Sequence, residues 1–197
     1  MFGKRLVHVV IASVCGGSLL AGGCAVAATT NPTTTVPAGR TAGAASAVKS
    51  GAVHLIDYSI DSDGPDSSVI LTGAIGDFGQ AVTVHPNGTV DPEHTSEMQL
   101  GLHHGSFRLN IAELDQKVRQ AYDPWPHNAA TCSGSISFTM PTPVVPGSGT
   151  GSYRGISGAF DLTVTIDEVD TPPVCDGSSA FLSQLILVAG SGEVAFH

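Results

Sequence analysis

The chain has 197 residues, of which 13% are charged, 42% are hydrophobic and 24 are glycines. Its length suits one ordinary domain with additional segments and excludes a large multidomain enzyme. The eight Lys and Arg residues against 17 Asp and Glu residues leave a formal net charge of −9. This charge argues against a protein that binds nucleic-acid phosphates.

The first residues predict an export signal. Lys4 and Arg5 precede a mostly apolar segment from Leu6 to Leu20, and small residues follow it. A basic start, a short apolar core and small residues before a cleavage site are typical of such signals. Read on to Ala28, the segment approaches the length of a membrane-spanning helix, so an uncleaved membrane anchor is the alternative.

Cys24 ends the run of small residues. The segment Leu20-Ala21-Gly22-Gly23-Cys24 resembles the lipobox of bacterial lipoproteins, although Leu20 stands one place earlier than the usual leucine. The resemblance implies removal of residues 1–23, a lipid with palmitate-type chains on the Cys24 sulfur, and a protein held at the extracytoplasmic face of the cell membrane. Two or more acyl chains hold a protein firmly on a bilayer.

Residues 24–50 predict a flexible tether. They are rich in Ala, Thr, Gly and Pro, and only Arg40 and Lys49 are charged, so they cannot build a core. Similar spacers in actinobacterial lipoproteins are often O-glycosylated. The remaining residues, 51–197, form one predicted domain with four cations and 17 acidic residues, a charge of −13. Such a domain is repelled by anionic lipid headgroups.

Two cysteines remain when Cys15 is removed with the signal and Cys24 carries the lipid. In an exported domain, Cys132 and Cys175 most simply form one disulfide. It closes a loop of about 44 residues, which the chain-entropy model values at roughly 4 kcal/mol.

The domain is predicted to be mainly β, an antiparallel β-barrel or sandwich with one short helix. Alternation places Ala52, Ile56, Tyr58 and Ile60 on one face of the first strand. A helix is predicted over 111–122, with Asn110 as its N-cap. The predicted strands cover 52–60, 68–75, 80–84, 98–102, 106–111, 135–140, 159–169, 181–189 and 193–196.

The segment from Gly149 to Gly158 reads GTGSYRGISG. It resembles a G-T-G-x-Y-x-G-x-x-G segment of uncharacterised actinobacterial exported proteins. It also resembles the glycine-rich strand of small β-barrels related to allene oxide cyclase and dirigent proteins. The resemblance implies a barrel fold and carries over no enzymatic activity.

Two clusters raise the possibility of a metal site. Asp61-Ser62-Asp63-Gly64-Pro65-Asp66 lacks the glycine and glutamate positions of an EF-hand loop, so a solvated turn is favoured over weak calcium binding. His85, His94, His103 and His104 lie within twenty residues. Adjacent His103 and His104 are predicted to point to opposite faces of a strand, so no metal ligand is assigned.

His104, Tyr153 and Arg154 are the candidate ligand-binding residues. Arg154 is one of only four cations after residue 50, so it is expected either to pair with a carboxylate or to meet a ligand. No catalytic residue and no cofactor are predicted.

The sequence favours a non-enzymatic envelope protein that binds a small apolar ligand, an envelope component or a protein partner. A barrel interior can hold a small apolar ligand. One alternative is a metal-assisted or acid–base enzyme built on the histidines, which requires two of them close to each other and to a carboxylate. Another is a structural surface antigen without a pocket.

Overall fold

The computed structural model describes residues 49–60, 67–90, 96–173, 175 and 181–197. The predicted signal, Cys24, nearly all of the predicted tether, the segment 61–66 and His94 lie outside the described residues. Within these ranges, no helix has the length and apolar character needed to cross a bilayer.

The described domain is one antiparallel sheet with a single α-helix. The sheet order is β5-β4-β3-β2-β1-β8-β7-β6, so the predicted mainly β, antiparallel fold with one short helix is confirmed. The elements are β1 Gly51–Ser59, β2 Ser67–Gly73, β3 Asp77–Val84, β4 Glu97–Leu102, β5 Gly105–Asn110, α1 Ala112–Tyr122, β6 Ser133–Pro143, the 3-10 helix η1 Gly151–Tyr153, β7 Ile156–Asp170 and β8 Phe181–Phe196.

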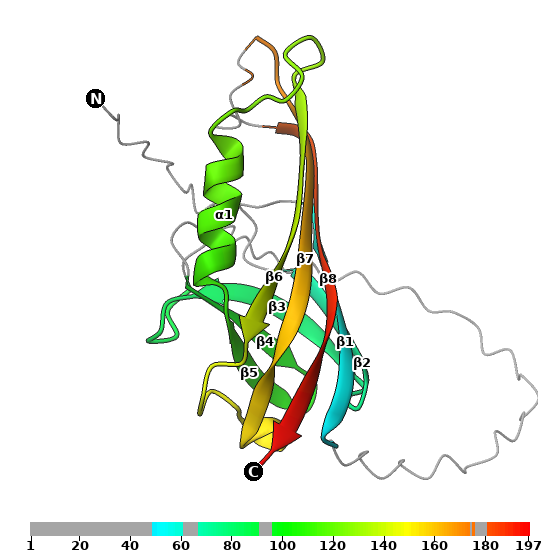
Figure 1. Ribbon diagram of the computed structural model, residues 1–197, viewed down its shortest axis with the longest axis vertical. Coiled ribbons are helices and arrows are strands. Elements are labelled where there is room, and N and C mark those ends of the chain that lie inside the picture. The colour runs from blue at the N-terminus through cyan, green and yellow to red at the C-terminus, as the bar shows by residue number, and fades with distance from the viewer. Residues whose placement is uncertain (1–48, 61–66, 91–95, 174, 176–180) are drawn as a thin grey trace, which may run out of the picture. The chain divides into compact units, whose positions relative to one another are not determined.

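The sheet curls into a half-barrel rather than a two-sheet sandwich (Figure 1). Its edge strands meet where Leu109 of β5 bridges Val144, and the Val145 N–H donates to the Arg108 carbonyl at 2.8 Å. Toward the start of β6, helix α1 lies beside the strand. The β4–β5 turn and η1 lie at one end of the sheet, the η1 end. The C-terminus of α1 and the start of β6 lie at the other, the disulfide end.

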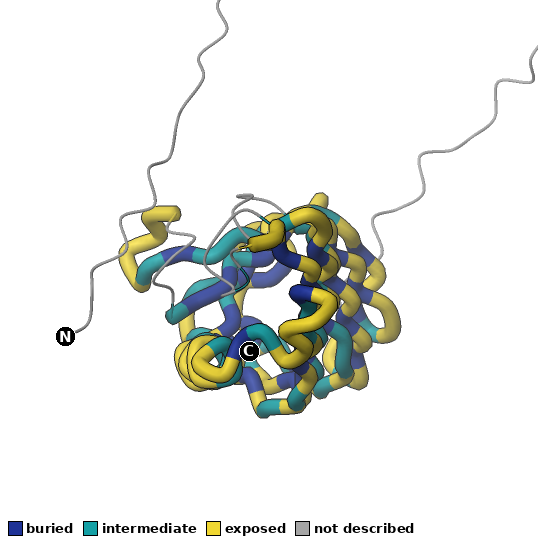
Figure 2. Tube along the Cα trace, turned by 90° about the horizontal axis from the view of Figure 1, so that it is seen from above, coloured by how far each residue is buried: buried dark blue, intermediate teal, exposed yellow. Residues whose placement is uncertain are grey.

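Side chains alternate between the interior and solvent, as the two-residue period of a strand requires. On β1, Val53, Leu55 and Asp57 are buried, whereas His54 and Ile56 between them are exposed. Figure 2 shows this alternation around the curled sheet. Large inward side chains that are at most 1% exposed form the core: Leu55, Leu71, Leu100, Phe107, Leu109, Tyr153, Phe160 and Leu162.

Residues 181–196 form a single strand where two were predicted, so the described domain has eight strands instead of nine. Gly190 lies opposite Leu162 of β7, and a Cβ at Gly190 would stand 2.0 Å from the Asp161 carbonyl oxygen. The glycine therefore permits a close approach of β7 without ending the strand.

Helix α1 begins one residue later than predicted. Ile111 occupies the N-cap position, and the Asn110 Oδ1 accepts a hydrogen bond from the Ala112 N–H at 3.1 Å. Leu114 and Val118 are half-buried against the core, on the face that the helical spacing predicted.

The disulfide prediction is confirmed. Cys132 and Cys175 are bonded, with Cα atoms 5.2 Å apart. Cys132 is buried, and its carbonyl accepts a hydrogen bond from the Asp170 N–H at 2.8 Å. The disulfide therefore fastens the segment before β6 to the segment after β7.

Candidate functional site

Asp77 is the centre of a polar cluster at the η1 end. Its side chain is 2% exposed, and its Oδ2 accepts the Tyr153 hydroxyl at 2.5 Å and the His104 backbone N–H at 3.0 Å. The His104 Nδ1 also lies 3.1 Å from Oδ2, and the Phe78 N–H donates to Oδ1 at 2.9 Å. One carboxylate thus joins β3, the β4–β5 turn and η1.

These donors decide the ionisation of Asp77. Burial by itself raises the pKa of the carboxyl group, but hydrogen bonds from Tyr153, Phe78 and His104 outweigh burial and lower that pKa. Burial, together with the hydrogen bond to the Asp77 carboxylate and its charge, raises the pKa of the Tyr153 phenol. Asp77 is therefore a carboxylate and Tyr153 a neutral phenol near neutral pH.

The prediction that His103 and His104 point to opposite faces of a strand is wrong. Both residues lie in the turn between β4 and β5, where strand alternation does not apply. Their rings meet edge to face with centroids 4.8 Å apart, and His103 also stacks on Phe78 at 5.9 Å. One ligand atom from each of Asp77, His103 and His104 lies within 4.8 Å of the others.

Two of the three predicted ligand-binding residues lie together in this cluster. Tyr153 is fully buried, with its ring against Phe107 at 5.3 Å, so it does not form an exposed contact surface. Arg154 is exposed and pairs with no carboxylate in the described part of the chain, so of its two expected roles the ion pair is not found there. Sequence reasoning missed Asp77, whose only signal is a lone carboxylate beside a glycine turn.

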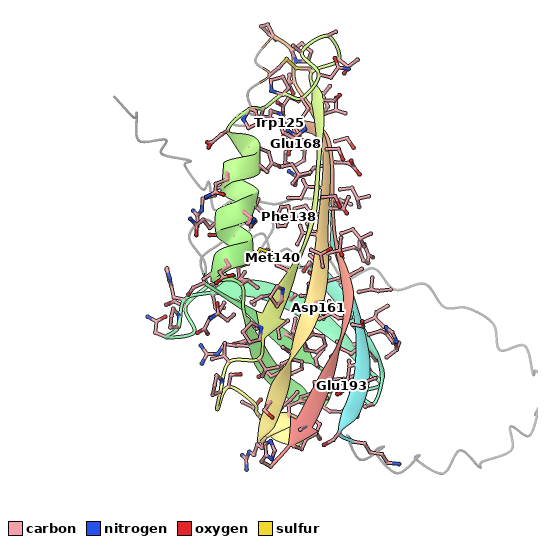
Figure 3. All side chains as sticks on the ribbon, in the orientation of Figure 1. Trp125, Phe138, Met140, Asp161, Glu168 and Glu193 are labelled. Carbon is pink, nitrogen blue, oxygen red and sulfur yellow. A yellow bond between two sulfur atoms is a disulfide. The ribbon has the colours of Figure 1, made fainter. Side chains whose placement is uncertain are left out.

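A second polar cluster attaches α1 to the sheet at the disulfide end. The Trp125 indole N–H donates to Asp170 at 2.8 Å, and the Tyr122 hydroxyl donates to Glu168 at 3.1 Å. The Gln184 amide also donates to Glu168. Burial, followed by the hydrogen bond to Asp170, raises the pKa of Glu168. Figure 3 shows Trp125 and Glu168 near this end of the sheet.

Asp57 is a buried carboxyl group that belongs to neither polar cluster. It lies on the inner face of β1 and is 5% exposed. Burial raises its pKa from 3.8 to about 6, although hydrogen bonds with Ser67 and the Tyr58 backbone oppose the shift. Its Oδ1 has no hydrogen-bond partner among the described residues.

The outer surface of the central strands carries a row of exposed apolar side chains. Ile56 lies beside Ile70 of β2, Ile70 lies beside Phe78 of β3, and Tyr58 lies beside Leu187 of β8. Their exposed fractions run from 36% for Leu187 to 63% for Phe78. We call Ile56, Tyr58, Ile70, Phe78, Leu185 and Leu187 the outer apolar face.

A groove of about 520 Å³ lies at the disulfide end. Leu185, a member of the outer apolar face, also lines this groove. Its other lining residues are His127, Asn128, Ser133, Gly134, Ser135, Asp167, Glu168, Val169 and Ser183.

Comparisons of the chain with known protein families, curated proteins and solved structures find no match. The resemblances to bacterial lipoproteins and to dirigent-type barrels therefore stay predictions.

Proposed function

We propose that the protein is exported, anchored to the cell membrane through a lipid on Cys24, and binds a partner protein through the outer apolar face. The observation that carries the binding role is the continuity of that face across β3, β2, β1 and β8. Monomeric proteins seldom leave neighbouring large apolar side chains in water unless a contact uses them.

The charge of the domain narrows the class of partner. Asp167 lies directly beside Leu185 on the outer surface, and Asp161 and Glu193 are exposed on β7 and β8 (Figure 3). A second copy would bring two domains of charge −13 together, and an anionic bilayer would be repelled in the same way. A partner with an apolar centre and a rim of Lys and Arg complements both features.

The packing of the interior favours the surface over a ligand held inside the sheet. At the η1 end, Tyr153, Phe107 and Phe160 fill the space between the strands and are at most 1% exposed. A partner contact on the outside requires no rearrangement of this core.

Peptides of defined chemistry test the binding role. We expect the acylated protein, in nanodiscs of neutral phosphatidylcholine, to bind an amphipathic Leu/Lys peptide at least tenfold more tightly than a Leu/Glu peptide. Replacing Ile56, which is 51% exposed, with Ser removes about 1 kcal/mol of apolar contact and weakens binding about fivefold.

The matched control is Val90→Ser, because Val90 is 55% exposed and lies outside the outer apolar face. We expect its affinity to equal that of the unmodified protein. The proposed face would be contradicted if Ile56→Ser and Val90→Ser lowered the peptide affinity equally. It would also be contradicted if the Leu/Lys and Leu/Glu peptides bound equally well.

Mass spectrometry of membrane-extracted protein tests the anchor. The expected mature chain begins at Cys24 and carries acyl chains, and Cys24→Ser releases it from the membrane. An intact leader on protein from the cytosol contradicts this assignment.

A further inference from the structure

We propose that Asp77, His103 and His104 form a binding site for a divalent transition-metal ion, with Zn²⁺ as the probe. The proposal goes beyond partner binding and does not depend on it. It rests on three donor side chains whose ligand atoms already lie within 4.8 Å of one another at the η1 end.

The spacing of the first two donors fits one metal ion. The Asp77 Oδ2 and the His104 Nδ1 are 3.1 Å apart. Two ligand atoms at about 2.0–2.1 Å from a tetrahedral zinc ion are separated by roughly 3.3 Å. A metal ion can therefore replace the proton between these two atoms with little movement of either side chain.

His103 supplies the third ligand. Its side chain is exposed and lies at a turn, so its ring can rotate toward the ion without disturbing the core. The stacking on Phe78 and the edge contact with His104 keep the ring on the correct side of the turn.

The chemistry of the donor set selects the class of metal. Two imidazoles and one carboxylate suit zinc and other first-row transition metals, whereas calcium and magnesium prefer oxygen ligands. Because His104 is 36% exposed and His103 lies in solvent, water can fill the remaining coordination positions.

The surroundings of Asp77 prepare the carboxylate for this role. The Tyr153 hydroxyl and the N–H groups of Phe78 and His104 hold its oxygens in place, and outer-shell donors of this kind orient metal ligands. The same contacts also fasten the turn to η1 in the absence of metal. These structural contacts do not use an imidazole ring. Removing the two rings therefore tests metal binding separately from the structural role.

The test is isothermal titration of the metal-free full chain with ZnCl₂, before and after His103→Ala/His104→Ala. The control, His54→Ala/His197→Ala, removes two exposed histidines elsewhere and keeps all three proposed metal ligands. We expect one Zn²⁺ equivalent to be lost, or its affinity to fall at least tenfold, only in the first variant. Substitution with Co²⁺ should give visible d–d absorption that the same variant abolishes.

Thermal unfolding of the metal-free proteins checks that both double variants are folded. An unchanged Zn²⁺ isotherm in a folded His103→Ala/His104→Ala variant would overturn the proposal. An equal loss of Zn²⁺ binding in the two double variants would overturn the proposal as well.

Discussion

Asp77 and Asp57 are both almost fully buried, yet their pKa values move in opposite directions. At the η1 end, hydrogen bonds from a phenol, two backbone N–H groups and an imidazole lower the pKa of Asp77. On β1, burial outweighs two hydrogen bonds and raises the pKa of Asp57 to about 6. Burial alone therefore does not determine the charge of a carboxyl group; the number of donors aimed at it does.

The two ends of the sheet also differ in how they are closed. The disulfide end has the Cys132–Cys175 bond and the contacts of Trp125 and Tyr122. The η1 end is closed by hydrogen bonds that converge on Asp77. Four measurements sharpen this comparison.

The largest effect is expected from the disulfide. Replacing both Cys132 and Cys175 with Ala should lower the free energy of unfolding by about 4 kcal/mol, because the unfolded chain regains the entropy of a long loop. Urea denaturation measures the loss. Hydrogen exchange should quicken first at the start of β6 and leave the Asp77 cluster protected; uniform quickening would contradict two separately closed ends.

Removal of the carboxylate at the η1 end comes next. Asp77→Ala leaves the fully buried Tyr153 hydroxyl and the His104 N–H without their acceptor, so we expect a loss of about 3 kcal/mol. Urea denaturation at pH 7 measures it. Asp57→Asn is the comparison, and it should not destabilise the domain; a similar loss in both variants would remove the distinction between the two carboxyl groups.

The Tyr153 hydroxyl should contribute a smaller amount. Tyr153→Phe keeps the ring against Phe107 but deletes one donor to the Asp77 carboxylate, a hydrogen bond to a charged group worth about 2 kcal/mol. The remaining donors still hold Asp77. Chemical denaturation measures the change, and an NMR titration should show the Asp77 pKa move upward; an unmoved Asp77 pKa would contradict the role of the phenol.

The smallest expected effect is a pH dependence from Asp57. Because its folded pKa, about 6, lies above its ordinary 3.8, the folded state binds more protons between these values and stability falls as pH rises through them. Lowering the pH from 7 to 5 should therefore stabilise the protein by about 1 kcal/mol through this group. The difference between unmodified protein and Asp57→Asn isolates it, and equal pH slopes would contradict the assignment.

The first strand illustrates how far the pattern of residues could be interpreted. Alternation correctly grouped Ile56 with Tyr58 on one face. The other face carries Val53, Leu55 and Asp57, so both faces are largely apolar and the pattern could not say which one is buried. The curl of the sheet decides which face of the strand is buried, because only the concave side of the sheet is enclosed by the other strands.

The candidate site shows the same limit. His104 and Tyr153 were identified separately, but 48 residues lie between them, and Asp77, which joins them, carried little signal. Gly151 permits the contact, since a Cβ there would stand 2.4 Å from the His104 carbonyl oxygen. The glycine is necessary for η1 to approach the turn, although the sequence does not reveal what it approaches.

The residues by themselves determined the antiparallel β character, the single helix and the pairing of Cys132 with Cys175, because hydrophobic period, turn residues and cysteine count act locally or by elimination. Tertiary structure decided which apolar face is left in water, which carboxyl groups are charged, and that two histidines and an aspartate meet. Each of these depends on strands far apart in the chain coming into register, and no local pattern records that register.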